Sequence, residues 1–334
     1  MQNLLSAWKE FKKGKMNKSE VQNFAFNLEN NLFNIHDKLK TESYKPSKYD
    51  FFFVRDPKLR PIHKATVRDR VIFQAVFRIL YHVFDPVFIY DSYSCRLGKG
   101  THAGTKRLEK FARKASKNYR QDCLVLKCDI KQFFYSVDHD IFMRLIGKKI
   151  RDSKLFNLIE KIIGSFQVQP GKGLPLGNVT SQLFTNIYLH ELDTFVKHKL
   201  KEKYYIRYCD DFVIIGKDYS HLKSLIPKLN IFLREKLKLN LHTRKTEIRK
   251  LNQGVDFLGY VVLPHRTVLR TKTKKRMFKK VKQKVVDCNS GVINDFELNQ
   301  SLQSYLGMLE HCAGYKIKTK LENEVWLDKE VKLC

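Results

Sequence analysis

The chain has 334 residues and carries 64 Lys or Arg against 34 Asp or Glu, which gives a formal net charge of +30. A surplus this large repels itself, so it predicts a polyanionic partner, and nucleic acid is the leading class because neutralising phosphates releases condensed counterions. No run approaches the roughly 18 apolar residues of a membrane span, and a signal peptide is not evident. The seven cysteines include no Cys-x-x-Cys pair, which disfavours a disulfide framework or structural zinc. We therefore expect a cytoplasmic protein without a membrane partner.

The first part of the chain is predicted to be helical and then to enter a strand. Residues 1–48 form a mostly helical extension, with these core candidates: Phe11, Val21, Phe24, Phe26, Leu28, Leu32 and Leu39. Phe51–Val54 is predicted to be a strand that Asp56-Pro57 turns back. Apolar residues then recur at helical spacing, which predicts a helix over residues 66–84 that ends before Pro86.

A two-faced helix and a strand with an acid near its end come next. The apolar face of the helix comprises Leu108, Phe111, Ala112, Ala115 and Tyr119. The opposite face comprises Lys106, Arg107, Lys110, Arg113, Lys114 and Lys117. The predicted strand covers Cys123–Ile130 and carries Asp129 near its C-terminal end, and a further helix is predicted over Ser136–Ile146.

Another helix is expected before residue 200, and Thr180 or Ser181 can cap its N-terminus. Its predicted buried stripe comprises Leu183, Phe184, Ile187, Tyr188, Leu192 and Phe195. Three acids of this part of the chain are interpreted as helix caps or surface residues: Asp138, Asp140 and Asp193.

Two adjacent carboxylates, Asp210 and Asp211, lie between strand-like runs at residues 204–207 and 212–216. The pattern predicts a hairpin with both acids at its turn. Neighbouring side chains of a regular strand point to opposite faces, so a turn is needed for both to reach one ion. Two like charges held together are stabilised by a cation, and a divalent metal is the natural partner.

The last 70 residues are strongly basic. Residues 266–284 contain ten basic and no acidic side chains, while Met277, Val281 and Val285 keep a period-four apolar stripe. This predicts a helix with one face on the core. Because helices separate the predicted strands, we expect a mixed α+β fold and not a parallel doubly wound sheet.

Asp129 adds a third carboxylate to the Asp210-Asp211 pair. An acid at the end of one strand and two at a hairpin turn can form one oxygen-rich site on a single sheet. Such sites select hard cations, here two Mg²⁺ ions with Mn²⁺ as a substitute. Two ions about 4 Å apart can hold the attacking and leaving oxygens of a phosphoryl displacement.

With these elements in order, the chain resembles reverse transcriptases. The central motifs are Asp129 followed by Phe134, a Gly-x-Pro-x-Gly loop at residues 173–177, and Tyr-x-Asp-Asp at residues 208–211. Further matches, in the family's order, are residues 56–62, 68–71, 96–100, 245–247 and 257–260. The resemblance runs from about residue 50 to residue 262 and implies a right-hand polymerase fold.

The resemblance implies four parts for such a polymerase. They are an N-terminal helical extension at 1–48, fingers at 49–120, a palm at 121–262 with an interleaved finger segment at about 145–175, and a helical thumb at 263–334. The palm sheet would carry the Asp triad. The thumb would track a template–primer duplex. No ribonuclease H or endonuclease domain is expected after it.

The resemblance also implies a role for individual residues. The implied metal ligands are Asp129, Asp210, Asp211 and the backbone carbonyl of Ile130, and Lys245 would protonate the leaving pyrophosphate. The implied nucleotide contacts are Lys58, Arg60 and Arg96 for the triphosphate, Phe134 as a gate against the ribose 2′-hydroxyl, and Leu176. The implied primer and template contacts are Gly177, Ser181, Gln182, Phe257, Leu258, Gly259, Tyr260, Lys274, Lys275 and Arg276.

The loop at residues 173–182 departs from most reverse transcriptases. Leu176 stands where most have Gln, and Gln182 where most have Pro. This variant resembles the reverse transcriptases of diversity-generating retroelements in bacteria and phages, as do the finger strings and the short length. That family copies a template-repeat RNA, from a DNA or RNA primer and with deoxynucleotides, into cDNA that is error-prone opposite adenines. A small basic accessory protein oligomer is the implied partner.

Other functions compete with this interpretation. A bacterial defence reverse transcriptase, retron-like or abortive-infection-like, would share the carboxylates. A group II intron protein is disfavoured because the chain ends where its maturase region would begin. A basic RNA-binding scaffold without chemistry is disfavoured by the intact Asp129, Asp210 and Asp211.

Overall fold

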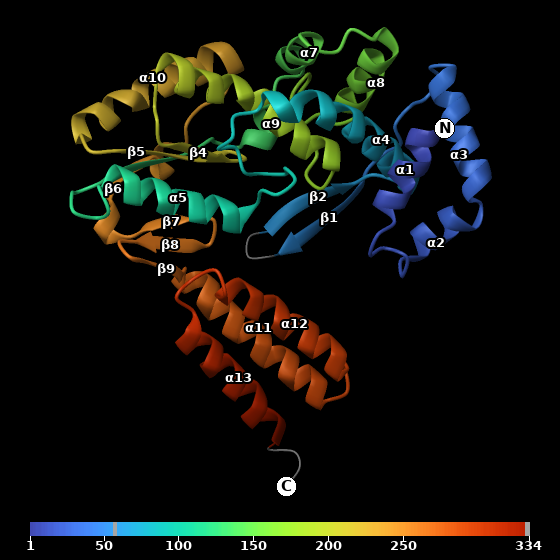
Figure 1. The fold of residues 1–334 in the computed structure, drawn as a ribbon. Helices are drawn as coiled ribbons and strands as arrows, with labels where there is room; N and C mark the ends of the chain where they lie inside the picture. The colour runs from blue at the N-terminus through green and yellow to red at the C-terminus, as the bar shows by residue number, and fades with distance from the viewer. Residues whose placement is uncertain (56–58, 331–334) are drawn as a thin grey trace. The chain divides into compact units, whose positions relative to one another are not determined.

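The computed structural model describes residues 1–55 and 59–330 (Figure 1). The described residues form two compact units. The first comprises those of Met1–Leu97, Cys128–Phe212 and Ser224–Thr246, and the second those of Gly98–Lys127, Val213–Lys223 and Glu247–Cys334. Helices are mixed with antiparallel strand pairs, which confirms the α+β class.

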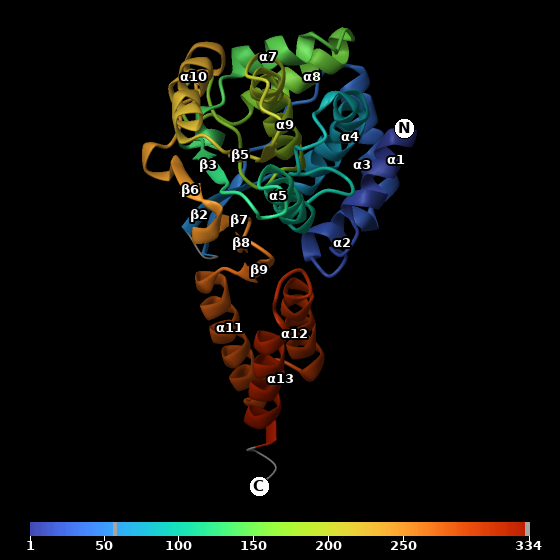
Figure 2. The ribbon, with the colours of Figure 1, turned by 60° about the vertical axis from the view of Figure 1, so that its left-hand side comes forward.

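The N-terminal segment is helical, as predicted. Its helices are α1 (Gln2–Phe11), α2 (Ser19–Phe26) and α3 (Leu28–Lys40), and they pack against α4 (Val67–Phe84), as Figure 2 shows. Trp8, Val21 and Leu32 are buried in this cluster. Phe26, however, is 89% exposed, so its prediction as a core residue is wrong. The buried face of α2 carries Val21 and Phe24, and a residue two positions beyond Phe24 points away from it.

The strand predicted at Phe51–Val54 is confirmed as part of β1 (Asp50–Arg55), which pairs antiparallel with β2 (Leu59–Lys64). The predicted turn at Asp56-Pro57 lies outside the described residues. Helix α4 ends before Pro86, as predicted, and the chain continues in η1 (Asp85–Val87).

A four-stranded sheet has the order β4 (Tyr205–Tyr208), β5 (Asp211–Gly216), β3 (Leu124–Asp129) and β6 (Glu247–Lys250). β3 and β6 run antiparallel. Val125, Leu126, Val213 and Ile214 are almost completely buried, as their β-branched and apolar character predicts for inner strands. The two-faced helix of the sequence is α5 (Thr101–Ala115), and α10 (Tyr219–Leu237) and η3 (Thr243–Lys245) precede β6.

Two helix starts differ from the predictions. Instead of one helix over Ser136–Ile146, α6 (Phe133–Ser136) is followed by α7 (His139–Gly147), because the Asp138 carboxylate accepts from Ile141 N and caps α7 there. After α8 (Ser153–Gly164), helix α9 (Val179–Thr194) follows its N-cap residue Asn178 and continues as a π-helical turn, Phe195–Lys199. Thr180 and Ser181 lie inside α9 and do not cap it.

The C-terminal part of the second unit joins a small sheet to three helices. After η4 (Leu251–Gln253), the sheet has the order β7 (Val255–Phe257), β8 (Tyr260–Leu263), β9 (Arg266–Leu269). The helices α11 (Thr271–Asn289), α12 (Asp295–Leu309) and α13 (Tyr315–Glu330) lie side by side in Figures 1 and 2. The predicted stripe of Met277, Val281 and Val285 is buried between them.

None of the helices in the described ranges combines the length and the apolar character that crossing a membrane requires.

Candidate active site

The hairpin predicted around Asp210-Asp211 is present, with Asp210 in its turn and Asp211 as the first residue of its second strand. β4 ends at Tyr208 and β5 begins at Asp211, so Cys209 and Asp210 form the connection. Cys209 has a φ of 56°, in the left-handed region that non-glycine residues occupy at a cost of about 1 kcal/mol or more. The surrounding structure therefore fixes a turn that an isolated hairpin of this sequence would adopt poorly.

Asp129 is held beside this turn from the end of β3. Ile130 N donates to the carbonyl of Asp210 (3.3 Å), and His242 N donates to the carbonyl of Asp129 (2.7 Å). Asp129 is only 8% exposed. Burial raises the pKa of Asp210, and the nearby negative charge of Asp129 raises it further. The structure thus brings two of the three predicted carboxylates into electrostatic contact, with Asp211 next in the chain.

Lys245 completes this group. It ends η3, and its Nζ donates to both carboxylate oxygens of Asp129 at 2.8 Å. The side chain of Lys245 is 45% exposed, whereas that of Asp129 is 11% exposed, so the ammonium reaches the carboxylate from the solvent side. The predicted catalytic lysine and the predicted metal ligand are therefore direct partners.

The donor chemistry of this group fits a hard divalent cation, because every carboxylate supplies oxygen ligands. Within residues 1–55 and 59–330, however, no three His, Cys, Asp or Glu side chains are arranged to hold a metal ion. Lys245 contacts both oxygens of Asp129, so a cation there would require Lys245 to withdraw. Ile130 forms an isolated antiparallel bridge with Leu241. The three-carboxylate site with the Ile130 carbonyl stays a prediction.

Beneath the turn lies a buried arginine that the sequence analysis did not identify. Arg207 is fully buried, and its guanidinium donates to both oxygens of Asp193 at 2.7 Å. It also donates to Asn186 Oδ1, Ser92 Oγ and the carbonyl of Cys209, each at 3.1 Å. The bond to Cys209 ties the strained residue of the turn to helix α9.

Asp193 is therefore neither a cap nor a surface acid, and that interpretation is wrong. It is fully buried and also accepts from Tyr205 Oη (2.8 Å). Burial alone would lower the pKa of Arg207, but the Asp193 carboxylate more than offsets this and raises it. The sequence contained a signal for this pair. Tyr205 and Arg207 are two residues apart in a strand-like run, so they share one face of the strand, and Asp193 directly follows Leu192 of the predicted buried stripe. Asp138 does cap a helix, as expected.

The loop after α8 is bonded to Phe134 on one side and to strand β2 on the other. Phe133 is buried while Phe134 is half-buried, so Phe133 takes the inward position of this pair. The carbonyl of Phe134 accepts from Leu174 N (2.6 Å), and that of Leu176 accepts from His63 N (3.2 Å). Gly177 has a φ of 110°, and a Cβ there would approach Ile62 Cγ2 at 3.3 Å.

The predicted triphosphate contacts have different surroundings. Lys58 lies outside the described residues, and Arg60 is exposed on β2. The side chain of Arg96 is 8% exposed and donates to Asp85 Oδ1 (2.6 Å) and to the carbonyl of Ile89 (2.7 Å). Arg96 therefore stabilises the segment after α4, and its contact with phosphate stays a prediction.

The remaining predicted contacts divide into buried and exposed positions. Ser181 is buried, whereas Gln182 is exposed and lines an open hollow of about 450 Å³ together with Arg96 and Leu97. In the second unit, Phe257 and Tyr260 are buried.

Leu258 and Gly259 form the turn between Phe257 and Tyr260, with φ of 53° and 93°, and the primer contact of residues 257–260 stays a prediction. Tyr260 Oη contacts His102 Nδ1 and donates to the carbonyl of Met308, both at 3.0 Å, so its side chain is committed to the core. On α11, Lys274 and Lys275 are exposed and Arg276 is half-buried.

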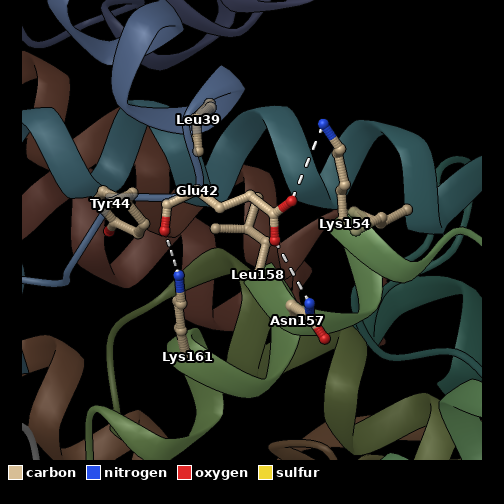
Figure 3. Close-up of a pocket in the computed structure, with 8 residues that line it drawn as sticks. Leu39, Glu42, Tyr44, Lys154, Asn157, Leu158 and Lys161 are labelled. Carbon is tan, nitrogen blue, oxygen red and sulfur yellow. Dashed lines mark hydrogen bonds and ion pairs between the residues drawn. The ribbon is translucent and has the colours of Figure 1, made fainter.

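A pocket of about 210 Å³ elsewhere in the first unit is drawn in Figure 3. The carbonyl of Glu42 accepts from Lys161, and its carboxylate accepts from Asn157 and pairs with Lys154. Leu39, Leu155 and Leu158 line the same pocket, which includes no predicted site residue. These contacts join α8 to the end of α3, which is a structural role.

Comparison with known proteins adds independent information. Residues 46–262 match the family described as "Reverse transcriptase (RNA-dependent DNA polymerase)". The chain is 28% identical over 325 residues to the group II intron-encoded protein LtrA of Lactococcus lactis subsp. cremoris, covering 74% of this chain and 53% of LtrA. It is 24% identical over 279 residues to protein YkfC of Escherichia coli K12, covering 70% of this chain and 71% of YkfC.

A third relative is the mitochondrial nuclear intron maturase 3 of Arabidopsis thaliana, at 23% identity over 300 residues, covering 77% of this chain and 41% of the maturase. The chain thus spans about half the length of LtrA. Because the family match covers well over half of its residues, this chain belongs to the reverse transcriptase (RNA-dependent DNA polymerase) family, with relatives of the group II intron type.

Proposed function

We propose that this reverse transcriptase copies a template-repeat RNA into cDNA that is error-prone opposite adenine, in a diversity-generating retroelement. Reverse transcriptases use divalent metal ions, an RNA template and a primer. The observation that carries the narrower role is the loop of residues 173–182, which has Leu176 and Gln182 where the resemblance implies Gln and Pro for most reverse transcriptases. A small basic accessory protein oligomer would act with the enzyme.

In this proposal, two Mg²⁺ ions would be held by Asp129, Asp210, Asp211 and the Ile130 carbonyl, and would supply positive charge to the reacting phosphate. The 3′-hydroxyl of the primer would lose its proton to solvent and form a bond to the α-phosphorus of a deoxynucleotide, while the bond from that phosphorus to the leaving pyrophosphate breaks. The chain's own contribution is positioning and charge. Lys245 would be displaced from the Asp129 carboxylate by a metal ion there, and the released ammonium would donate a proton to the leaving pyrophosphate.

In the arrangement that the resemblance implies, the fingers comprise residues 49–120, the palm 121–262 and the thumb 263–334. Arg60 and Arg96 would then contact the triphosphate. Lys274, Lys275 and Arg276 would follow the duplex backbone, to which Lys and Arg give sequence-independent contacts.

Phe134→Ala is expected to admit ribonucleotides. The half-buried ring of Phe134 would lie under the sugar, where its bulk excludes a 2′-hydroxyl, and its removal should reduce discrimination against ribonucleotides about tenfold or more. The ratio of kcat/KM for dATP and ATP in primer extension measures this. Phe134→Tyr is the control that keeps the ring, and unchanged discrimination in Phe134→Ala would contradict the gate.

Leu176 gives a physical reason for low fidelity. A Gln side chain can donate and accept hydrogen bonds near the nascent base pair, whereas Leu offers only bulk. One well-placed hydrogen bond is worth on the order of 1–3 kcal/mol of discrimination, which is roughly ten- to a hundredfold in error rate. The backbone of Leu176 is bonded to β2 at His63, so a change of its side chain should leave the path of the loop intact.

Leu176→Gln is therefore expected to lower misincorporation opposite template adenine about tenfold or more, and less at other template bases. Sequencing cDNA made from one RNA template by both forms measures the error at each base. Leu176→Met is the matched control, because it changes shape without adding a hydrogen-bonding group. Equal adenine errors in the Gln and Leu forms would refute the proposed basis of mutagenesis.

A further inference from the structure

Helix α5 presents a basic surface that the proposed chemistry does not use. One side of the helix is buried through Leu108, Phe111, Ala112 and Ala115. The exposed side carries Lys106, Lys110, Arg113 and Lys114, which together with Glu109 line an open hollow of about 430 Å³. The spacing of four, three and one residues places these four cations on one face of the helix.

In the part of the chain that the structure describes, none of these four cations is in a salt bridge with an acidic side chain. Cations elsewhere do form such salt bridges. Glu109 is the acid that shares the hollow with them, and its carboxylate accepts a contact from Thr267 Oγ1 at 3.5 Å. Four positive charges therefore lie within about 12 Å of helix and repel one another unless an anion neutralises them.

The surface also lacks what a protein partner requires. Protein interfaces are anchored by aromatic or other large apolar side chains at their centre. No exposed large apolar residue lies between 101 and 117, a stretch that the structure describes throughout, since Phe111 is buried and Arg107 stacks on its ring at 4.3 Å. Lys and Arg alone suffice for phosphate contacts.

We propose that the face of α5 formed by Lys106, Lys110, Arg113 and Lys114 binds the sugar–phosphate backbone of folded RNA, at a site separate from the template–primer. The inference rests on the proposed function, because an enzyme that copies one particular RNA needs contacts with that RNA away from the reacting end. The contacts read shape and charge and not base sequence.

The test compares two variants with the same loss of charge. One is the triple variant Lys106→Gln, Lys110→Gln, Lys114→Gln. The matched control is Lys223→Gln, Lys228→Gln, Lys236→Gln, which removes three exposed lysines from α10. The probe is a fluorescent RNA hairpin with a blunt 20-base-pair stem, whose binding constant is measured over a range of KCl concentrations without nucleotides.

A plot of log binding constant against log salt concentration has a negative slope. We expect the magnitude of this slope to decrease by about 3 in the α5 variant, about 1 for each lost phosphate contact, and by less than 1 in the control. Restoring charge with Arg at the three α5 positions should restore the slope. Extension of a short primer–template should stay within twofold of wild type in the α5 variant.

Equal slopes for the two Gln variants would overturn the proposal. The proposal would also be overturned if the α5 variant lost both hairpin binding and extension of the short primer–template, because the face would then hold the template–primer. Unchanged hairpin binding with loss of an acidic protein partner would assign the face to that protein and overturn it too. A wild type that binds the hairpin through α5 but makes no cDNA would refute the proposed function alone.

Discussion

Asp129→Asn is expected to reduce DNA synthesis about 100- to 1,000-fold or more. The side chain of Asn has nearly the same shape, so the change removes charge and little packing. The Asp129 carboxylate is buried at the end of β3, is paired with Lys245 through both oxygens, and acts on Asp210 through its charge. Removing a preorganised charge at the reacting centre typically has an effect of this size. Primer extension on an RNA template with Mg²⁺ and deoxynucleotides measures it.

A matched control separates catalysis from general acidity. Asp140→Asn removes a carboxylate from the exposed first turn of α7, where a surface acid was predicted, and should keep wild-type activity. Asp140→Asn should keep the free energy of unfolding in urea within about 0.5 kcal/mol of wild type, the usual effect of a surface change. Asp129→Asn should still show one cooperative unfolding transition, which separates lost activity from lost folding. Full activity in Asp129→Asn would remove Asp129 from the active site and with it the proposed mechanism.

The parts of the site that could be predicted are those that local sequence determines. β-Branched and apolar runs on both sides of Asp210-Asp211 favour strands, and two acids between such runs favour a turn, so the hairpin followed from about twelve residues. The strand ending at Asp129 and the stripe at Met277, Val281 and Val285 were predictable for the same reason.

The parts that could not be predicted depend on partners distant in the sequence. Asp193 has the residue type of a surface acid, and only the position of Arg207, on another element, makes its burial favourable. Arg96 has the residue type of a phosphate ligand, yet its guanidinium is held by Asp85 and by backbone carbonyls. The start of α9 at Val179 also depends on where the preceding loop attaches to β2.

The division of the chain into two compact units could not be predicted from the sequence pattern either. Each unit is assembled from separate stretches of the chain, and the sequence pattern predicts elements without stating which stretches pack together. The polar contacts that fix the Asp210 turn come from such stretches, through Ile130, Arg207 and Ser92. The places of the predicted catalytic acids in the fold were thus predictable, whereas the support that holds them was not.

Arg207→Met is expected to destabilise the protein by about 3–5 kcal/mol. The change leaves the fully buried Asp193 carboxylate without the cation that compensates its charge, and breaking one partner of a buried pair has a cost of this size. Urea unfolding followed by tryptophan fluorescence measures it as a lower midpoint with an unchanged slope.

The double variant Arg207→Met, Asp193→Leu separates stability from function. It removes both charges and replaces them with apolar side chains, so most of the lost stability should return. Activity should not return in proportion, because a methionine side chain has no donor for the carbonyl of Cys209, and the strained turn that carries Asp210 would lose one of its supports. We expect DNA synthesis in the double variant to stay about tenfold or more below wild type. Recovery of activity together with stability would show that Arg207 only neutralises Asp193 and does not position the turn.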